Sequence, residues 1–214
     1  MDYDLEHKLY VVGYEDGTLR PENNITRAET ATIFYRLLRD DVQKQYKTEI
    51  NKFTDVNEDN WFNISVSTLA NIGVIGGYSD GSFKPNQYIT RAEFVALMIK
   101  LFDINSENVM NRFTDVLEND WYYNAILASV NKGFIAGYPD GSFKPNQFIT
   151  RAEACKIVNK MLDRKPTKPG FYNHLIDWPD LSENAWYYLD MIEATHSHIA
   201  DYNYFKDNLE NWNK

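Results

Sequence analysis

One motif occurs three times in this chain of 214 residues and constrains its fold more than any other feature. It reads GYEDGTLRPENNITRAE at 13–29, GYSDGSFKPNQYITRAE at 77–93 and GYPDGSFKPNQFITRAE at 137–153, with no gap. Self-similarity of this kind is the signature of a repeat architecture, in which one unit cannot bury its apolar face alone. We therefore expect several similar pieces that pack on one another.

Each copy of the motif predicts a turn followed by a helix. The Asp-Gly dipeptide is typical of a turn, and the proline after it keeps the next residues out of a helix. The final Thr-Arg-Ala-Glu is a capping box, preceded by an isoleucine that can act as a hydrophobic staple. We assign the three glutamates mainly to capping; they are Glu29, Glu93 and Glu153.

The arginine of each capping box falls in the first turn of its predicted helix, at Arg27, Arg91 and Arg151. This is an unusual place for a cation, because the helix N-terminus is already partly positive. Two interpretations stay open from the residues alone. Each arginine pairs with a nearby aspartate or carbonyl, or its donor fork and the free N–H groups of the helix form an anion site.

A second motif alternates with the first, and it joins Phe-Thr-Asp-Val to a later tryptophan. It occurs twice, and a diverged third copy begins at Trp178. Each later tryptophan is expected to open a helix. Core packing of the tryptophans and a turn-forming role of the aspartates stay open beside ligand binding. The residues concerned are Asp55, Asp115, Asp180, Trp61, Trp121 and Trp186.

Together the two motifs resemble the S-layer homology family, whose modules join an F-x-D-V…W helix to a G-Y-x-D-G-x-F-x-P…I-T-R-A-E helix. The resemblance implies a mainly α fold of three modules in a pseudo-threefold helical spindle. It also implies an extracellular protein of the cell wall or S-layer, anchored non-covalently through a secondary cell-wall polysaccharide that carries a pyruvylated sugar. The family's arginine, aspartate and tryptophan positions match the residues named above.

The order of the motifs departs from the family's pattern, because the chain reads half, whole, whole, half. We expect one structural unit made of segments 1–52, 53–112, 113–176 and 177–214, with the first module split between the two ends of the chain. The region of Thr195 to Ile199 should then lie close to Leu9 to Val11. Residues 40–52 are expected to be a charged connection, 163–176 a loop, and the aromatic tail 202–214 a cap on the core.

A pyruvylated sugar needs an aromatic surface for its ring and a planar cationic fork for its carboxylate. We expect three grooves, each where a T-R-A-E helix meets the next F-x-D…W helix of the sequence. Glycines 13, 77 and 137 are expected to let the backbone approach the ligand closely. The predicted groups are Arg27 with Asp55 and Trp61, Arg91 with Asp115 and Trp121, and Arg151 with Asp180 and Trp186, beside Gly13, Gly77 and Gly137.

Composition excludes other classes of function. A formal net charge of −9 argues against nucleic-acid binding through phosphate contacts. No apolar run is long enough for membrane insertion. Cys155, the single cysteine, is expected to be a small buried thiol. The chain is expected to be a monomer, a pseudo-trimer within one polypeptide.

No catalytic constellation or cofactor motif is evident, so we expect neither an enzyme nor a cofactor. A metal site is not expected either, because His196 and His198 are two residues apart and would face different sides of a helix. Two alternatives to anchoring stay open. One is a structural lattice or protein-interaction module whose arginines are internal pairs. The weaker one is a glycan hydrolase, which would need two carboxyl groups beside one bond.

Overall fold

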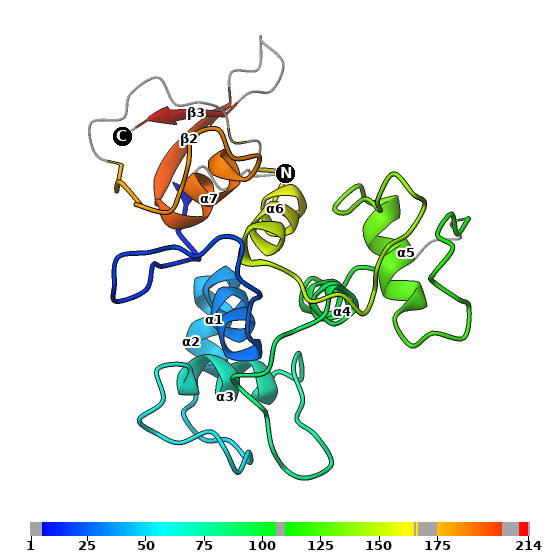
Figure 1. Cartoon of the computed structure of the whole chain (residues 1–214). Helices are drawn as coiled ribbons and strands as arrows, with labels where there is room; N and C mark the ends of the chain where they lie inside the picture. Colours follow the sequence, from blue (N-terminus) through cyan, green and yellow to red (C-terminus); the bar gives the residue numbers. More distant parts are fainter. Residues whose placement is uncertain (1–5, 106–109, 165, 167–174, 203–209, 214) are drawn as a thin grey trace. The chain divides into compact units, whose positions relative to one another are not determined.

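The computed structural model describes residues 6–105, 110–164, 166, 175–202 and 210–213, and this part of the chain is mainly helical (Figure 1). It divides into two compact units, called here the central unit (24–149) and the terminal unit (1–23 with 150–214). The central unit contains α1 (Arg27–Leu37), α2 (Asp40–Tyr46), α3 (Asn63–Asn71), α4 (Arg91–Leu101) and α5 (Tyr123–Asn131). The terminal unit contains β1 (Glu6–His7), α6 (Arg151–Met161), α7 (Tyr188–Thr195), β2 (His198–Tyr202) and β3 (Glu210–Asn213).

The predicted capping boxes open α1, α4 and α6. In each box the threonine hydroxyl accepts the backbone N–H of the glutamate three residues on. The glutamate carboxylate accepts the N–H of the threonine in return, at 2.8 Å for Thr26, 2.8 Å for Thr90 and 2.9 Å for Thr150. Two backbone donors are thus satisfied at each helix start. The capping role predicted for the three glutamates is confirmed.

The three isoleucines before the capping boxes form a closed cycle of backbone hydrogen bonds inside the central unit. Ile25 N–H donates to the Ile149 carbonyl at 3.0 Å, Ile89 to Ile25 at 3.1 Å, and Ile149 to Ile89 at 3.1 Å. All three isoleucines are fully buried. The three copies of the motif therefore meet at one point, and a mainly α arrangement of three modules is confirmed. The closed spindle stays a prediction.

The central unit consists of packed helix pairs beside the three isoleucines. Helix α1 packs against both α3 and α4, and α4 packs against α5 (Figure 1). The rings of Phe34 and Phe94 join α1 to α4 at a centroid distance of 5.3 Å. Helix α3 ends at Asn71, and Gly73, two residues later, has a φ of +78°, which permits the left-handed turn that follows a helix.

Helix α2 lies within the segment that we expected to be a connection. It has no buried residue, although it packs beside α3. Its start carries Asp40 and Asp41, which the positive end of a helix favours. A helix without an apolar stripe leaves no periodic pattern in the sequence, so the sequence did not predict α2.

The terminal unit joins the two ends of the chain as predicted. The N–H groups of Tyr10 and Val11 donate to the Ala194 carbonyl at 3.0 and 2.9 Å, and the Leu9 N–H donates to Ser197 Oγ at 2.9 Å. Helix α6 packs against α7. The two halves of the split first module are therefore in contact.

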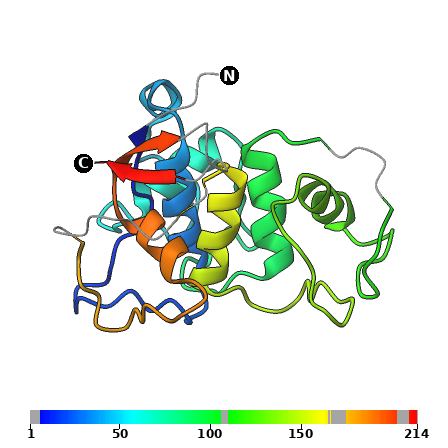
Figure 2. The same ribbon diagram turned by 90° about the horizontal axis from the view of Figure 1, so that it is seen from above.

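A small antiparallel sheet, in the order β1-β2-β3, completes this unit (Figure 2). The sequence did not predict it. The tail forms β3 where a cap on the core was expected, and Tyr204 and Phe205 lie outside the described residues. Most of the predicted loop 163–176 lies outside them as well.

Candidate functional site

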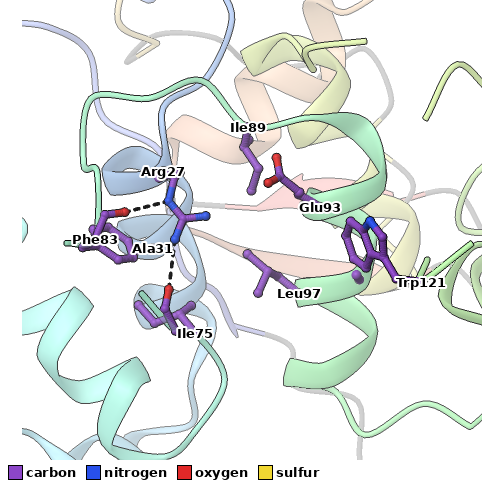
Figure 3. A pocket seen from close by; sticks show the side chains of 10 residues that line it. Arg27, Ala31, Ile75, Phe83, Ile89, Glu93, Leu97 and Trp121 are labelled. Atoms are coloured by element: carbon purple, nitrogen blue, oxygen red, sulfur yellow. Dashed lines mark hydrogen bonds between the residues drawn. The ribbon is translucent and has the colours of Figure 1, made fainter. Parts of the chain in front are cut away.

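The central unit contains a small pocket of about 110 Å³ (Figure 3). Its walls come from α1, from α4, from the segment between α3 and α4, and from Trp121, two residues before α5. Pockets for drug-sized ligands hold roughly 300–1,000 Å³, so this one accommodates a substituent or one edge of a larger molecule. The lining residues are Arg27, Ala31, Ile75, Gly76, Phe83, Ile89, Glu93, Ala96, Leu97 and Trp121.

Arg27 contributes the positive charge of the pocket. Its Nε donates to the Phe83 carbonyl at 2.9 Å, and its Nη2 donates to the Gly76 carbonyl at 3.0 Å. Among the described residues, its Nη1 has no hydrogen-bond partner, and in Figure 3 this group points into the pocket. Arg27 is half-buried. Part of its donor fork is therefore available to a ligand.

Arg91 and Arg151 make the same first contact as Arg27 but are more deeply placed. The Nε of Arg91 donates to the Phe143 carbonyl at 3.1 Å, and that of Arg151 donates to the Leu19 carbonyl at 2.9 Å. Both arginines are only 5% exposed. The interpretation that each arginine pairs with a nearby carbonyl is thus confirmed in all three copies.

Two cations contact the ring of one tyrosine in each copy of the motif. The Tyr78 ring has the Arg27 guanidinium at 5.1 Å and the Lys84 ammonium at 4.0 Å from its centroid. Such contacts orient the cations over the ring. Sequence reasoning missed this role, although the tyrosine and the basic residue recur at fixed positions. The equivalent sets are Arg91, Tyr138 and Lys144, and Arg151, Tyr14 and Arg20.

The helix N-termini do not supply the free donors expected beside the arginines. The N–H of Arg27 donates to the Gln87 carbonyl at 2.9 Å, and the N–H of Ala28 donates to the Pro85 carbonyl at 3.0 Å. The next donor, on Glu29, is bonded to Thr26 Oγ1 at 3.2 Å. This part of the anion-site interpretation was wrong, because neighbouring carbonyls already satisfy these groups. An anion in the pocket would be recognised by the guanidinium.

The aspartates of the second motif hold the turns that receive the arginines. The two Asp55 carboxylate oxygens accept the N–H groups of Phe83 and Lys84 at 2.7 and 2.8 Å. Phe83 therefore connects Asp55 to Arg27, because its carbonyl accepts from the arginine. Asp115 binds Phe143 and Lys144 in the same way, and Asp180 binds Leu19 and Arg20. Their role as turn partners is confirmed, and Asp55 itself does not line the pocket.

The tryptophans are exposed, and one of them lines the pocket. Trp61, Trp121 and Trp186 are 66%, 68% and 57% exposed, so core packing is not their main role. Trp121 faces the pocket together with Arg27, whereas the predicted companion, Trp61, does not line it. This pocket combines Arg27 with Trp121 because α1 packs against both α3 and α4, and the pocket lies on the α4 side. The grouping of Arg27 with Asp55 and Trp61 stays a prediction. In the terminal unit, the Lys156 ammonium lies 4.7 Å from the Trp186 ring centroid.

The motif's first glycine makes room for an aromatic ring of the protein itself. A Cβ added to Gly77 would lie 2.5 Å from the Phe53 ring and 2.6 Å from the Ser82 carbonyl. The same ring approach occurs at Gly137 and, from Trp178, at Gly13. The space beside the Cα atom of each of these glycines is therefore filled by protein atoms, and a role of the glycines in ligand approach stays a prediction.

The buried cysteine is not a candidate nucleophile. Cys155 is 1% exposed in α6. Burial raises the pKa of its thiol to about 12, so the thiol stays protonated near neutral pH. The predicted small buried thiol is confirmed.

Comparisons with known proteins agree with the repeat pattern. The model of the S-layer homology domain matches residues 5–31, 52–95 and 112–155. The chain is 35% identical to a cellulosome-anchoring protein of Acetivibrio thermocellus over 205 residues, which is 92% of this chain and 45% of that protein. It is 33% identical to cell surface glycoprotein 1 of the same organism over 210 residues, 92% of this chain and 9% of that protein.

A shorter match, 38% identical over 94 residues, joins the chain to the surface-layer 125 kDa protein of Lysinibacillus sphaericus. It covers 44% of this chain and 8% of that protein. The chain thus spans less than half the length of each of these relatives. The three family-model segments cover more than half of its residues and contain its three capping boxes. The chain therefore belongs to the S-layer homology domain family, a family of cell-surface proteins.

Proposed function

We propose that this chain anchors a surface protein non-covalently to the cell wall by binding a pyruvylated secondary cell-wall polysaccharide in the Arg27 pocket. One observation carries the proposal: a partly exposed guanidinium and an exposed indole line the same small pocket (Figure 3). Family membership and the name of the cellulosome-anchoring relative support an anchoring role. No helix among the described residues has the length and apolar character needed to cross a membrane.

Different residues of the pocket are expected to contact different groups of the pyruvylated sugar. The Nη1 group of Arg27 offers donors to the carboxylate of a pyruvyl ketal. The Trp121 ring offers an apolar surface to the C–H groups of the sugar. The Glu93 carboxylate, which already caps α4 through Thr90, can accept a sugar hydroxyl. The pocket's size suits a ketal substituent better than a whole oligosaccharide.

The acidic character of the chain does not oppose this recognition. The net charge of −9 is spread over the whole chain, and charges farther away than about 8 Å are largely screened at physiological salt. The guanidinium meets the ligand's carboxylate at contact distance. A local arginine can therefore bind an anionic polymer on an acidic protein.

Hydrolysis is the weaker alternative. A glycosidase needs two carboxyl groups on either side of one bond. Glu93 is the single carboxylate among the residues that line the pocket, and one of its oxygens is held in the capping box. The pocket therefore lacks the second carboxyl group.

A protein-interaction or lattice module is the second candidate function. It is favoured by one observation, the internal pairing of all three arginines with backbone carbonyls. If pairing is their whole role, replacing Arg27 will change folding stability and leave polymer binding per folded molecule unchanged.

The test is calorimetric titration of the chain with purified wall polysaccharide, native and after mild acid has removed the pyruvyl groups. We expect binding to the native polymer and at least about a tenfold loss of affinity for the treated polymer. Equal binding to both would contradict pyruvyl recognition, and binding to neither would favour the protein-interaction module. Release of reducing ends during the titration would revive the hydrolase alternative.

A further inference from the structure

The terminal unit contains a cluster of metal-ligating side chains, none of which belongs to the pocket of the central unit. It consists of His7 on β1, Glu193 on α7 and His198 on β2, and one ligand atom from each lies within 4.8 Å of the others. His7 is 4% exposed, Glu193 is fully buried and His198 is 9% exposed. The sequence analysis missed the cluster because His198 is on a strand and because its partners are far away along the chain.

The geometry of the cluster is close to that of a metal site. His7 Nδ1 lies 2.9 Å from Glu193 Oε1, and His198 Nε2 lies 3.4 Å from Glu193 Oε2. Ligands at 2.0–2.2 Å from a tetrahedral zinc ion are roughly 3.4 Å from one another. The two ligand atoms that are farthest apart, at up to 4.8 Å, therefore need to approach each other by little more than about 1 Å to hold an ion.

Glu193 carries the observation that points to a ligand. Among the described residues, its Oε2 atom is buried and accepts no hydrogen bond, and it faces His198 Nε2 at 3.4 Å. A buried acceptor without a hydrogen bond is costly, and a bound cation is one of the few groups that would compensate it. The other oxygen, Oε1, is 3.1 Å from Arg164 Nη1. A donor that holds one carboxylate oxygen in this way orients the carboxylate toward a metal ion.

We propose that His7, Glu193 and His198 form a site for a divalent transition-metal ion, with zinc as the best match. Two imidazoles and one carboxylate are ligands that zinc accepts, and water would complete the tetrahedron. The nearby Arg164 guanidinium is positively charged and repels a bound zinc ion. The affinity for zinc therefore depends on how well the Glu193 carboxylate neutralises both the ion and the guanidinium. The proposal is independent of polysaccharide binding.

The bound ion would link the N-terminal and C-terminal halves of the split first module. His7 belongs to the N-terminal half of this module, while Glu193 and His198 belong to its C-terminal half. The halves already share the β1–β2 pairing, in which His7 lies opposite His198. A metal ion bound to both would link the two ends of the chain and raise the stability of the terminal unit.

The experiment titrates tag-free protein, stripped with a chelator and desalted, with zinc chloride in a calorimeter. We expect one ion per chain and, at zinc a hundredfold above Kd, a rise in melting temperature of roughly 5–10 °C. Cobalt(II) serves as the spectroscopic probe, because a tetrahedral site gives it intense visible absorption. Absence of saturable zinc binding to the folded chain would overturn the proposal.

Three variants localise the site. His198→Gln and Glu193→Gln are each expected to lower zinc affinity by at least about a hundredfold. His196→Gln is the matched control, since His196 bonds the Ile192 carbonyl and the Ile176 N–H outside the cluster, and it should keep zinc affinity unchanged. Unaltered affinity in folded His198→Gln would overturn the site. If Glu193→Gln fails to fold by circular dichroism, His198→Gln and His7→Gln decide the question.

Discussion

Arg27 in the central unit and Arg151 in the terminal unit occupy the same motif position and make the same hydrogen bond. Each Nε donates at 2.9 Å to the carbonyl of a turn residue, which is Phe83 for Arg27 and Leu19 for Arg151. Their exposure differs. Arg27 is half-buried and lines a pocket, whereas Arg151 is 5% exposed.

The difference shows that one motif can carry two roles. The hydrogen bond to the turn is common to all copies, so it explains why the motif contains arginine at all. Access for a ligand depends instead on what surrounds the guanidinium. We infer that Arg151 acts mainly in stability, and that Arg27 can act in stability and in binding.

Replacement of the buried arginines should have the largest effect. Arg151→Ala and Arg91→Ala each remove a buried charge-assisted hydrogen bond and a cation–π contact, and we expect each to lower the free energy of unfolding by about 2–4 kcal/mol. Arg27→Ala should cost about 1 kcal/mol less, because water replaces part of its contacts. Urea unfolding followed by tryptophan fluorescence measures these values. Equal losses at Arg27 and Arg151 would remove the contrast between them.

Replacement of Gly77 tests the turn that receives Arg27. In Gly77→Ala the new methyl group meets the Phe53 ring and the Ser82 carbonyl, so we expect a loss of about 1–3 kcal/mol. Gly76→Ala is the control. A Cβ there meets nothing within 4 Å, and its effect should stay within about 0.5 kcal/mol. Similar unfolding curves for the two variants would contradict the packing role of Gly77.

A comparison of two exposed tryptophans tests whether polysaccharide binds in the pocket or elsewhere on the surface. Trp121→Ala should weaken polysaccharide binding by at least about tenfold, since aromatic side chains in small pockets often dominate binding energy. Trp61→Ala removes an equally exposed indole outside this pocket and should change affinity by less than about threefold. Both should leave stability nearly unchanged. Calorimetry compares them, and a larger loss in Trp61→Ala would move the site away from Arg27.

The smallest expected effect is the loss of turn stability at low pH. The Thr18 hydroxyl and Arg20 lower the pKa of Asp16 to about 2, and Ser82 lowers the pKa of Asp80. A lowered carboxyl pKa adds stability above the unfolded value of about 3.9, and this is lost as pH falls through the folded value. Both turns should therefore persist at pH 5 and weaken below about pH 4. Carbon-detected NMR titration checks this, and a midpoint near 4 for Asp16 would contradict it.

Local signals in the sequence predicted much of the fold. The capping boxes located the starts of α1, α4 and α6 because the Thr and Glu of a box bond each other over three residues. The half-modules at the two ends predicted that Thr195 to Ile199 lies close to Leu9 to Val11, and the hydrogen bond from Leu9 to Ser197 confirms it. Helix α2 and the three strands were not predicted, because they lack a periodic apolar pattern or depend on pairing between distant segments.

Two residues of the candidate site, Arg27 and Trp121, were predicted to bind ligand, but the sequence did not predict that they line one pocket. Arg27 and Trp121 were both named in advance, yet in different grooves. Sequence order suggested that Arg27 would meet the next tryptophan, Trp61, but the packing of α1 against α4 brings Trp121 instead. The sequence also did not predict the difference in burial between Arg27 and Arg151, since both arginines stand in the same I-T-R-A-E sequence.

The most direct measurement combines one variant with two ligands. The affinity of Arg27→Gln and of the unaltered chain is measured by calorimetry for native and pyruvyl-free polysaccharide, with folding verified by circular dichroism. If Arg27 holds the pyruvyl carboxylate, the unaltered chain will bind the native polymer at least about tenfold more tightly than the treated one, and Arg27→Gln will bind both equally. A variant that keeps the full preference for the native polymer would contradict the assignment of this pocket.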